Sequence, residues 1–175
     1  MNATEAWFDQ PNLRVRALLN RFVDAGADFV VIGGVAVIMQ GAPRFTKDLD
    51  ICYSTEIGNL DRLGRVLIAL KATLRGVEED IPFVPDGRTL RYTQILTLHT
   101  PEGNLDLLAR PDGAPTFASL KARADKMTLD GLEVPIASVK DLMAMKRAAG
   151  RPQDLVDLET LEIIRSRTKS YRRTL

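Results

Sequence analysis

The sequence has little of the chemistry on which many enzymes and secreted proteins depend. It contains one cysteine and one histidine among 175 residues, which excludes an intramolecular disulfide and a His/Cys zinc site. No apolar run reaches the length of a membrane-spanning helix. The first ten residues lack the basic start and apolar core of a secretion signal. We therefore expect a cytoplasmic protein whose metal, if it uses one, is held by carboxylates, which favours magnesium, manganese or calcium.

A strong charge of either sign is also missing. Twenty-four basic and 23 acidic residues leave a formal net charge of +1, which creates no general field for attracting nucleic acid. Positive charge is concentrated only near the end of the chain, from Arg165 to Arg173. We interpret this segment as a solvated helix end, with RNA binding as the alternative.

The spacing of apolar residues predicts one α/β (α+β) protein, with a small mixed sheet flanked by helices and a helical C-terminal part. We expect an N-terminal helix within residues 1–27, a core over 28–136, and a helical part over 137–175 that packs on this core. The expected helices cover 13–25, 35–40, 60–74, 117–126, 138–149 and 152–164; the expected strands cover 29–32, 48–53, 94–100 and 104–109, with a tight hairpin at 128–134 and mostly loop at 75–91.

Three aspartates lie in predicted strands, where burying a charged side chain costs free energy. Asp48 and Asp50 are two residues apart in one strand, so their side chains point to the same face. Two such carboxylates repel each other unless a cation lies between them, and Mg²⁺ is bound by one or two carboxylates together with substrate phosphates. Asp106 interrupts an apolar run of leucines, where a carboxylate is costly. We predict that these three side chains bind metal and act in catalysis, with a solvent-facing position as the alternative for Asp106.

A second group of residues is suited to binding phosphate. Gly33-Gly34 follows a buried strand and precedes a helix, so phosphate oxygens could approach backbone N–H groups there. Arg44 and Lys47 could add side-chain charge to the same phosphates. For Arg44 an ion pair with Asp48 or Asp50 is equally open.

Together these residues resemble the DNA polymerase β-type nucleotidyltransferase superfamily, and most closely the small bacterial AbiEii-like or MNT-like proteins. The resemblance covers roughly residues 28 to 165. It rests on two motifs, Gly33-Gly34-x-Ala36 with Gly41 and Arg44-x-Thr46-x-Asp48-x-Asp50 followed by Asp106, and a downstream stretch from Val139 to Leu158 that contains Lys146, Arg151, Asp154 and Asp157.

The resemblance implies a minimal polymerase-type palm that moves a nucleoside monophosphate from a nucleoside triphosphate to an acceptor hydroxyl. Mg²⁺, or Mn²⁺, would be held by Asp48 and Asp50, and Asp106 would be the third ligand or the base. Many members have Gly-Ser in place of Gly33-Gly34, so the backbone must supply the phosphate contact here. The residues then expected to bind substrate are Gly33, Gly34, Arg44, Thr46, Lys47, Lys146, Arg151 and Asp154.

The sequence leaves several alternatives open. The acceptor could be RNA, for example a tRNA end, in a toxin–antitoxin or phage-defence setting with a cognate toxin or antitoxin protein. It could also be a small molecule, as in aminoglycoside nucleotidyltransferases, or the chain could be a non-catalytic or protein-modifying partner. Lys146 and its acidic neighbours could instead form a salt-bridge network at a helix junction, because charged residues three or four apart on a helix are neighbours.

Overall fold

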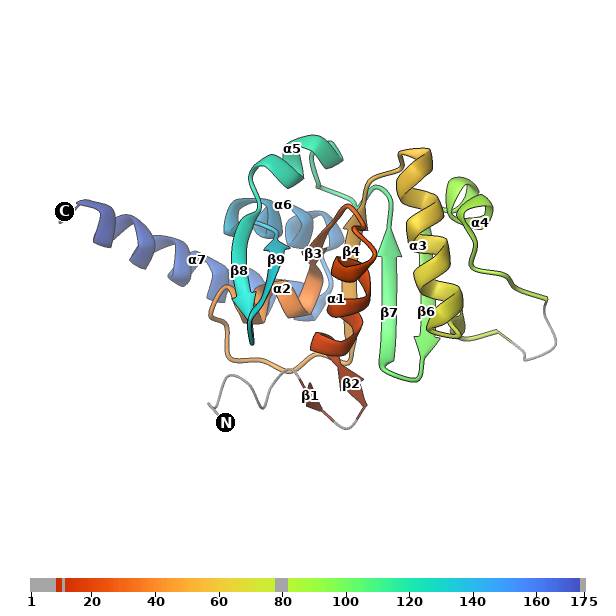
Figure 1. Cartoon of the computed structure of the whole chain (residues 1–175). Coiled ribbons are helices and arrows are strands. Elements are labelled where there is room, and N and C mark those ends of the chain that lie inside the picture. The colour runs from red at the N-terminus through yellow and green to blue at the C-terminus, as the bar shows by residue number, and fades with distance from the viewer. Residues whose placement is uncertain (1–8, 11, 78–81, 174–175) are drawn as a thin grey trace.

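The computed structural model describes residues 9–10, 12–77 and 82–173, and a mixed β-sheet forms its centre (Figure 1). The strands are β1 (Asp9–Gln10), β2 (Leu13–Arg14), β3 (Phe29–Ile32), β4 (Asp48–Tyr53), β5 (Thr73–Leu74), β6 (Ile95–Thr100), β7 (Gly103–Leu108), β8 (Asp125–Leu129) and β9 (Leu132–Ile136). The helices are α1 (Val15–Asp24), α2 (Gly33–Met39), α3 (Ile57–Ala69), α4 (Gly87–Tyr92), α5 (Phe117–Ala122), α6 (Val139–Ala149) and α7 (Pro152–Arg173).

The sheet has the order β1-β2-β7-β4-β3-β9-β8, and β6 pairs with β7 and carries β5 on its other edge. Strand β4 is parallel to β7 and antiparallel to β3, while β3 is parallel to β9. The β6–β7 and β8–β9 hairpins are antiparallel. The predicted class, a mixed sheet with flanking helices and a helical C-terminal part, is confirmed.

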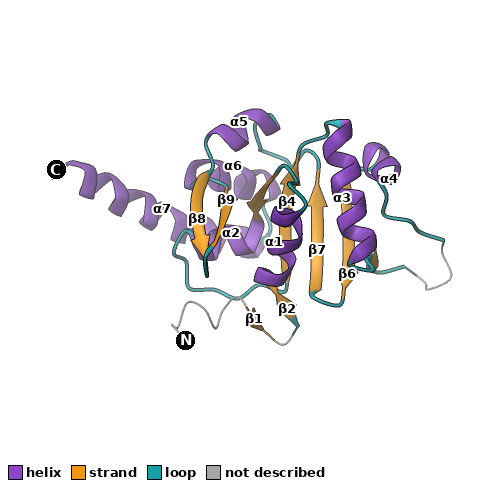
Figure 2. Ribbon diagram, in the orientation of Figure 1, coloured by secondary structure: helices purple, strands orange, loops and turns teal. Residues whose placement is uncertain are grey.

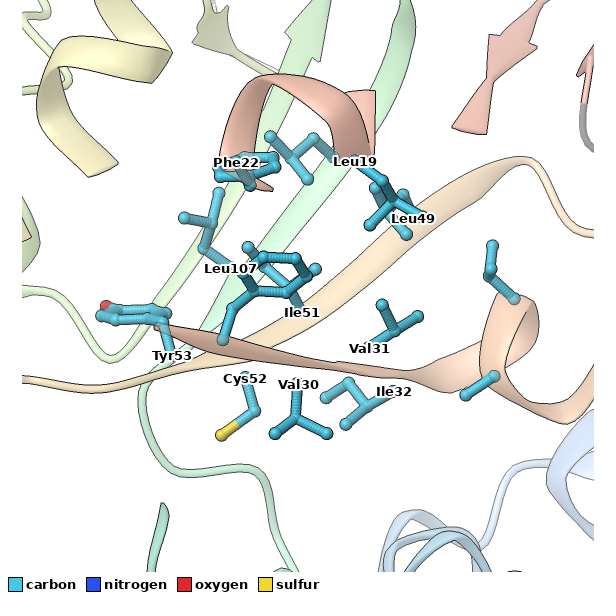
Figure 3. Close-up of a cluster of buried hydrophobic side chains, with 14 of the residues drawn as sticks. Leu19, Phe22, Val30, Val31, Ile32, Leu49, Ile51, Cys52, Tyr53 and Leu107 are labelled. Carbon is cyan, nitrogen blue, oxygen red and sulfur yellow. The ribbon is translucent and has the colours of Figure 1, made fainter. Parts of the chain in front are cut away.

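The main core lies between the sheet and helices α1 and α3, which cover one face of it (Figures 1 and 2). Leu19 and Phe22 of α1 face Leu49 and Ile51 of β4 and Leu107 of β7 (Figure 3). All five side chains have 0% exposure, and burial of each contributes about 1.5–3 kcal/mol. This packing fixes α1 against the two strands that carry the aspartates.

The opposite face of β4 is the one that positions polar groups. Val30 and Cys52 point away from α1 in Figure 3, on the side opposite Ile51. Because side chains alternate along a strand, Asp48 and Asp50 share this second face with Cys52.

Two expected helices are too long at their C-terminal ends. The helix expected over 60–74 is α3, which starts at Ile57 and ends at Ala69. The chain then turns at Lys71 with φ of 51° before Thr73–Leu74 pairs with β6. The helix expected over 117–126 ends at Ala122, because Asp125 already pairs with Ile136 in the β8–β9 hairpin. In both places the chain pairs with another strand although its local pattern is helical. The periodicity of apolar residues alone does not predict such pairing.

Other boundaries also differ. The segment 75–91, expected to be mostly loop, includes most of α4, whose first turn is capped by Asp86 accepting from the Thr89 N–H. The N-terminal helix begins at Val15 rather than residue 13, after the short strand β2, and α2 begins at Gly33 rather than residue 35.

Several boundaries agree with the prediction. Strands 29–32 and 48–53 have the expected limits, and Asp130-Gly131 forms the turn of the β8–β9 hairpin with positive φ at both residues. Ser138 caps α6, and Gly150 ends it in the left-handed conformation. Among the described helices none combines the length and apolar character needed to cross a membrane.

Candidate active site

Strands β4 and β7 bring three aspartates onto one face of the sheet. Asp50 lies directly opposite Asp106 in the parallel pair, and Asp48 lies opposite Asn104. Residues opposite each other on neighbouring strands point to the same side, so the three carboxylates share the face away from α1. The Asp106 side chain is only 16% exposed, so the alternative of a solvent-facing position does not describe it.

Arg75 is the basic residue in contact with this carboxylate cluster, defined as Asp48, Asp50 and Asp106. Its Nη2 lies 2.8 Å and 2.9 Å from the two carboxylate oxygens of Asp106. Its Nη1 lies 3.9 Å from Oδ2 of Asp48. The guanidinium therefore stands between two of the three carboxylates and offsets part of their charge.

The carboxylate of Asp50 is left with little compensation. Burial, together with the neighbouring carboxylates of Asp48 and Asp106, raises the pKa of Asp50 to about 7, against the opposing effects of Lys146 and a backbone hydrogen bond from Gly34. Burial also raises the pKa of Asp106, although Arg75 opposes this rise. A cation would stabilise the charged form of a carboxyl group that burial and neighbouring carboxylates keep from ionising.

Gly33 and Gly34 are required by the close approach of two other side chains. Gly33 has φ of +63°, and a Cβ on it would lie 2.0 Å from Oδ2 of Asp50. A Cβ on Gly34 would lie 2.5 Å from Oγ1 of Thr46. The paired glycines thus let β3 and α2 fit closely against Asp50 and Thr46, and a serine at position 34 would displace Thr46.

Thr46 and Lys47 have different environments despite being neighbours. Thr46 is buried, and its hydroxyl lies 3.1 Å from Oδ1 of Asp48, to which it can donate, so it orients this carboxylate. Lys47 is exposed and lines a pocket of about 550 Å³ together with His99 and Asn104. Since Asn104 is opposite Asp48, this pocket lies beside one end of the carboxylate cluster.

Lys146 forms the centre of a buried ion-pair network with Arg44, Arg151, Asp154 and Asp157. Its Nζ lies 2.9 Å from Oδ1 of Asp154 and 2.8 Å from Oδ2 of Asp157, and its side chain is 8% exposed. Arg44 contributes Nη1 at 2.5 Å from Oδ2 of Asp157, so the expected alternative pairing of Arg44 with Asp48 or Asp50 is wrong. The salt-bridge network at the helix junction therefore exists, and it reaches the loop before β4.

Asp154 is the fully buried carboxylate of this network. Burial alone would raise the pKa of Asp154, but hydrogen bonds from Arg151 and Lys146 lower it to about 2. Arg151 keeps most of its side chain exposed while its Nε donates to Asp154 at 2.8 Å. Arg151 also interacts electrostatically with Asp50 and Asp48, which joins the network to the carboxylate cluster.

A pocket of about 330 Å³ opens between the carboxylate cluster and the network. Gly33 lies in its lining, and the charged residues of the lining are Asp50, Arg110, Asp112, Lys146, Arg151 and Asp154. The rest of the wall is apolar and includes Ile32, Ile95, Leu108, Leu142 and Met145. Small-molecule sites of about 300–1,000 Å³ commonly combine such an apolar wall with a few charged groups, so the pocket is suited to part of a nucleotide.

The donor set of the carboxylate cluster fits a hard divalent cation. Its ligating atoms are carboxylate oxygens, and burial together with the carboxylates of Asp48 and Asp106 raises the pKa of Asp50. Across the described ranges no three His, Cys, Asp or Glu side chains stand ready to hold one ion. The cation shared by Asp106 and Asp48 is Arg75, so a metal ion would have to replace or join this guanidinium.

Sequence reasoning missed Arg75, since it lies in a segment expected to be loop and belongs to no motif. It also missed the ion pair between Arg44 and Asp157, two residues that are 113 positions apart in the chain. The only sequence signal for Arg75 is its place directly after Thr73-Leu74, a short β-forming pair that carries it to the sheet edge.

The sequence matches the profile of one protein family, described as "Nucleotidyl transferase AbiEii toxin, Type IV TA system", over residues 16–166. This range includes the carboxylate cluster, Gly33-Gly34 and the network around Lys146. No curated protein matches the chain.

Several solved structures share the fold. The lincosamide antibiotic adenylyltransferase LnuA, with lincomycin bound, matches with a TM-score of 0.57 and 16% identity, covering 86% of this chain and 95% of that one. The antibiotic-resistance factor ANT(2'')-Ia in solution matches with a TM-score of 0.55 and 13% identity, over 91% of each chain. An antigenic nucleotidyltransferase-like protein from Paracoccidioides brasiliensis matches with a TM-score of 0.50 and 17% identity, over 83% and 72% of the two chains.

Proposed function

This chain belongs to the nucleotidyl transferase AbiEii family, and from that membership we propose that it transfers a nucleoside monophosphate from a nucleoside triphosphate to an acceptor hydroxyl. The observation that carries the proposal is the meeting of Asp48, Asp50 and Asp106 on one sheet face, with Asp50 and Asp106 directly opposite each other. Phosphoryl transfer depends on positioning and on neutralising negative charge, and a cluster of under-compensated carboxylates is suited to recruit the cation that does so.

The cluster would hold Mg²⁺, or Mn²⁺, through carboxylate oxygens of Asp48, Asp50 and Asp106. When bound, this metal supplies positive charge that neutralises the triphosphate and the charge developing during transfer. Thr46 keeps the Asp48 carboxylate oriented, because its hydroxyl lies 3.1 Å from Oδ1. Gly33 leaves room for Asp50 at the floor of the pocket.

Asp106 is the residue we assign to proton removal. Burial raises the pKa of Asp106, which makes its carboxylate a stronger base than an exposed aspartate. One of its Oδ atoms accepts the proton of the acceptor hydroxyl, and the acceptor oxygen forms a bond to the α-phosphorus. The bond from that phosphorus to the bridging oxygen of the β-phosphate breaks in line, and pyrophosphate leaves.

We assign the 330 Å³ pocket to the nucleotide, because it lies between Asp50 and the positive charges of Lys146 and Arg151. The Arg151 side chain donates to Asp154 but is 73% exposed, so a triphosphate can reach its guanidinium from solvent. Lys146 is held by Asp154 and Asp157 and acts at the pocket wall as a fixed positive charge near Asp50. Arg44, Thr46 and Asp154 position other groups, while Gly34 and Lys47 remain candidates for direct substrate contact.

For the acceptor we propose RNA, including a tRNA end, in a toxin–antitoxin setting with a cognate antitoxin protein. The family description, which names a toxin of a type IV system, supports this setting. A small-molecule acceptor is the second candidate, and the shared fold with a lincosamide antibiotic adenylyltransferase favours it. A protein acceptor is the third outcome that the experiment distinguishes.

The test is to incubate the protein with each α-³²P-labelled nucleoside triphosphate and Mg²⁺, separately with total RNA, total protein and an antibiotic panel. We expect label on RNA, and Asp50→Asn should abolish it. Asp130→Asn is the matched control, since Asp130 is an exposed residue in the turn of the β8–β9 hairpin and pairs with Arg16 of α1. Label carried equally by wild type and Asp50→Asn would refute the proposal, whereas label on protein or antibiotic would change only the acceptor class.

A further inference from the structure

Arg75, the residue directly after β5, stands at the end of a row of residues that continues across β6, β7 and β4. Its backbone N–H donates to the Thr97 carbonyl at 3.0 Å, which continues the β5–β6 pairing by one residue. Thr97 lies opposite Asp106, and Asp106 lies opposite Asp50. Arg75, Thr97, Asp106 and Asp50 therefore share one level of the sheet, so the long arginine side chain reaches across the short threonine to the carboxylates.

The contacts of Arg75 are those of a counter-cation. Nη2 contacts both oxygens of Asp106 at 2.8 Å and 2.9 Å, and Nη1 is turned toward Asp48 at 3.9 Å. The Arg75 side chain is 32% exposed, so it can leave the cluster for solvent without unpacking a core. No other ion pair is recorded for Arg75 within the described ranges, so its charge serves these two aspartates alone.

A guanidinium in this place and a divalent cation on the same carboxylates are mutually unfavourable. Both are positive, both would use oxygens of Asp106 and Asp48, and like charges at such short range repel strongly in a partly buried site. We propose that Arg75 is a built-in competitor for the metal site, which must leave Asp106 and Asp48 before a divalent cation can bind there. This inference rests on the metal site of the proposed function and adds a residue that controls its occupancy.

The exchange has a consequence for how metal and nucleotide bind. With Arg75 in place the protein alone should bind divalent metal weakly. A triphosphate brings negative charge that favours both the incoming metal and the displaced guanidinium. Metal and nucleotide should therefore bind cooperatively, and part of that cooperativity should depend on Arg75.

The experiment measures Mn²⁺ binding directly by electron paramagnetic resonance of the free ion, without any turnover. In the absence of nucleotide, Arg75→Gln should bind Mn²⁺ about tenfold more tightly than wild type, because a neighbouring positive charge has been removed. Arg75→Lys, which keeps the charge, should stay within about threefold of wild type. Arg65→Gln is the matched control: Arg65 is an exposed arginine of α3, the helix that covers the opposite face of the sheet, so its loss should change the Kd by less than about threefold.

A second measurement follows the wild-type protein and uses the variant only to assign one signal. The Arg75 Nε–H signal in a ¹⁵N correlation spectrum, assigned by its absence from Arg75→Gln, should shift when Mg²⁺ and a non-hydrolysable nucleotide are added together. Mn²⁺ affinity in Arg75→Gln equal to or weaker than wild type, or an Arg75 signal that Mg²⁺ and nucleotide leave unmoved, would overturn the inference.

Asp50→Asn separates this failure from failure of the proposed function. If wild type with nucleotide binds Mn²⁺, Asp50→Asn does not, and Arg75→Gln matches wild type, only the role of Arg75 is wrong. If wild type binds no Mn²⁺ with nucleotide, and Asp50→Asn still transfers label, the metal site itself is wrong and the inference falls with it.

Discussion

Arg44 and Asp157 are 113 residues apart in the chain, yet Nη1 of the first lies 2.5 Å from Oδ2 of the second. This contact joins the loop that leads into β4 to helix α7. Lys146 of α6 holds the same carboxylate, at 2.8 Å. The C-terminal helices are therefore tied to the segment that delivers Asp48, and the network has a structural role whatever its role toward substrate.

Replacing Lys146 should test this structural role. Lys146→Met keeps most of the side-chain volume but leaves Asp154 and Asp157 buried with fewer partners, so we expect the free energy of unfolding to fall by about 3 kcal/mol. Urea denaturation followed by circular dichroism would measure it. Arg147→Gln is the control, because the neighbouring Arg147 forms an exposed pair with Glu162 and should lose less than about 0.5 kcal/mol. Equal losses in the two variants would show that the buried network adds no stability.

The close approach at Gly33 gives a second prediction, with a control of nearly identical backbone. Gly33 and Gly26 have φ of +63° and +62°, but a Cβ at Gly26 would have nothing within 4 Å, whereas one at Gly33 would collide with Asp50. Gly26→Ala should cost about 1 kcal/mol through the positive φ alone. Gly33→Ala should cost at least about 2 kcal/mol more, since the collision adds to this strain, and should also abolish transfer. Similar melting temperatures for both variants would contradict the collision.

These features differ in how far the sequence reveals them. Alternation along one strand is a local property, so the shared face of Asp48 and Asp50 follows from spacing alone. Asp106 joins them only through the β4–β7 register, which pairs segments more than fifty residues apart. The sequence suggested Asp106 as a site residue, because a charge in a run of leucines is costly. It did not predict that Asp106 lies opposite Asp50.

Arg75 and Arg44 show where this reasoning ends. Each is a single basic residue whose partner is distant in the sequence. Strand order brings Arg75 to Asp106, and the packing of α7 brings Asp157 to Arg44. In contrast, Asp154 and Asp157 are three residues apart on one helix, and their proximity to each other could be predicted. Local periodicity therefore identifies elements and side-chain faces, and tertiary pairing decides which charges meet.

Metal and nucleotide should stabilise the folded protein through the carboxylate cluster. At a free concentration about 100-fold above Kd, a ligand specific to the folded state adds about 2.7 kcal/mol. For a domain of this size we expect Mg²⁺ with a non-hydrolysable nucleoside triphosphate to raise the melting temperature by about 5–11 °C. Differential scanning fluorimetry measures this, with EDTA as the reversal control. Asp48→Asn should remove most of the shift and Asp130→Asn should keep it; a full shift in Asp48→Asn would contradict metal binding at the cluster.

The raised pKa of Asp50 predicts how stability depends on pH when metal is absent. Burial and the carboxylates of Asp48 and Asp106 raise this pKa to about 7 in the folded protein from 3.8, so between these values the folded state holds a proton that the unfolded state has lost. Stability should therefore fall as pH rises from 4 to 7, and the loss should be complete above pH 7. Asp50→Asn cannot ionise, so in EDTA it should exceed wild type by roughly 4 kcal/mol at pH 8 and match it near pH 4. Chemical denaturation of both proteins across this range measures the difference, with Asp130→Asn as the variant whose curve should follow wild type. A difference that is constant with pH would mean that the Asp50 carboxylate already has its counter-charge in the metal-free fold, and the case for a cation at this position would lose its physical basis.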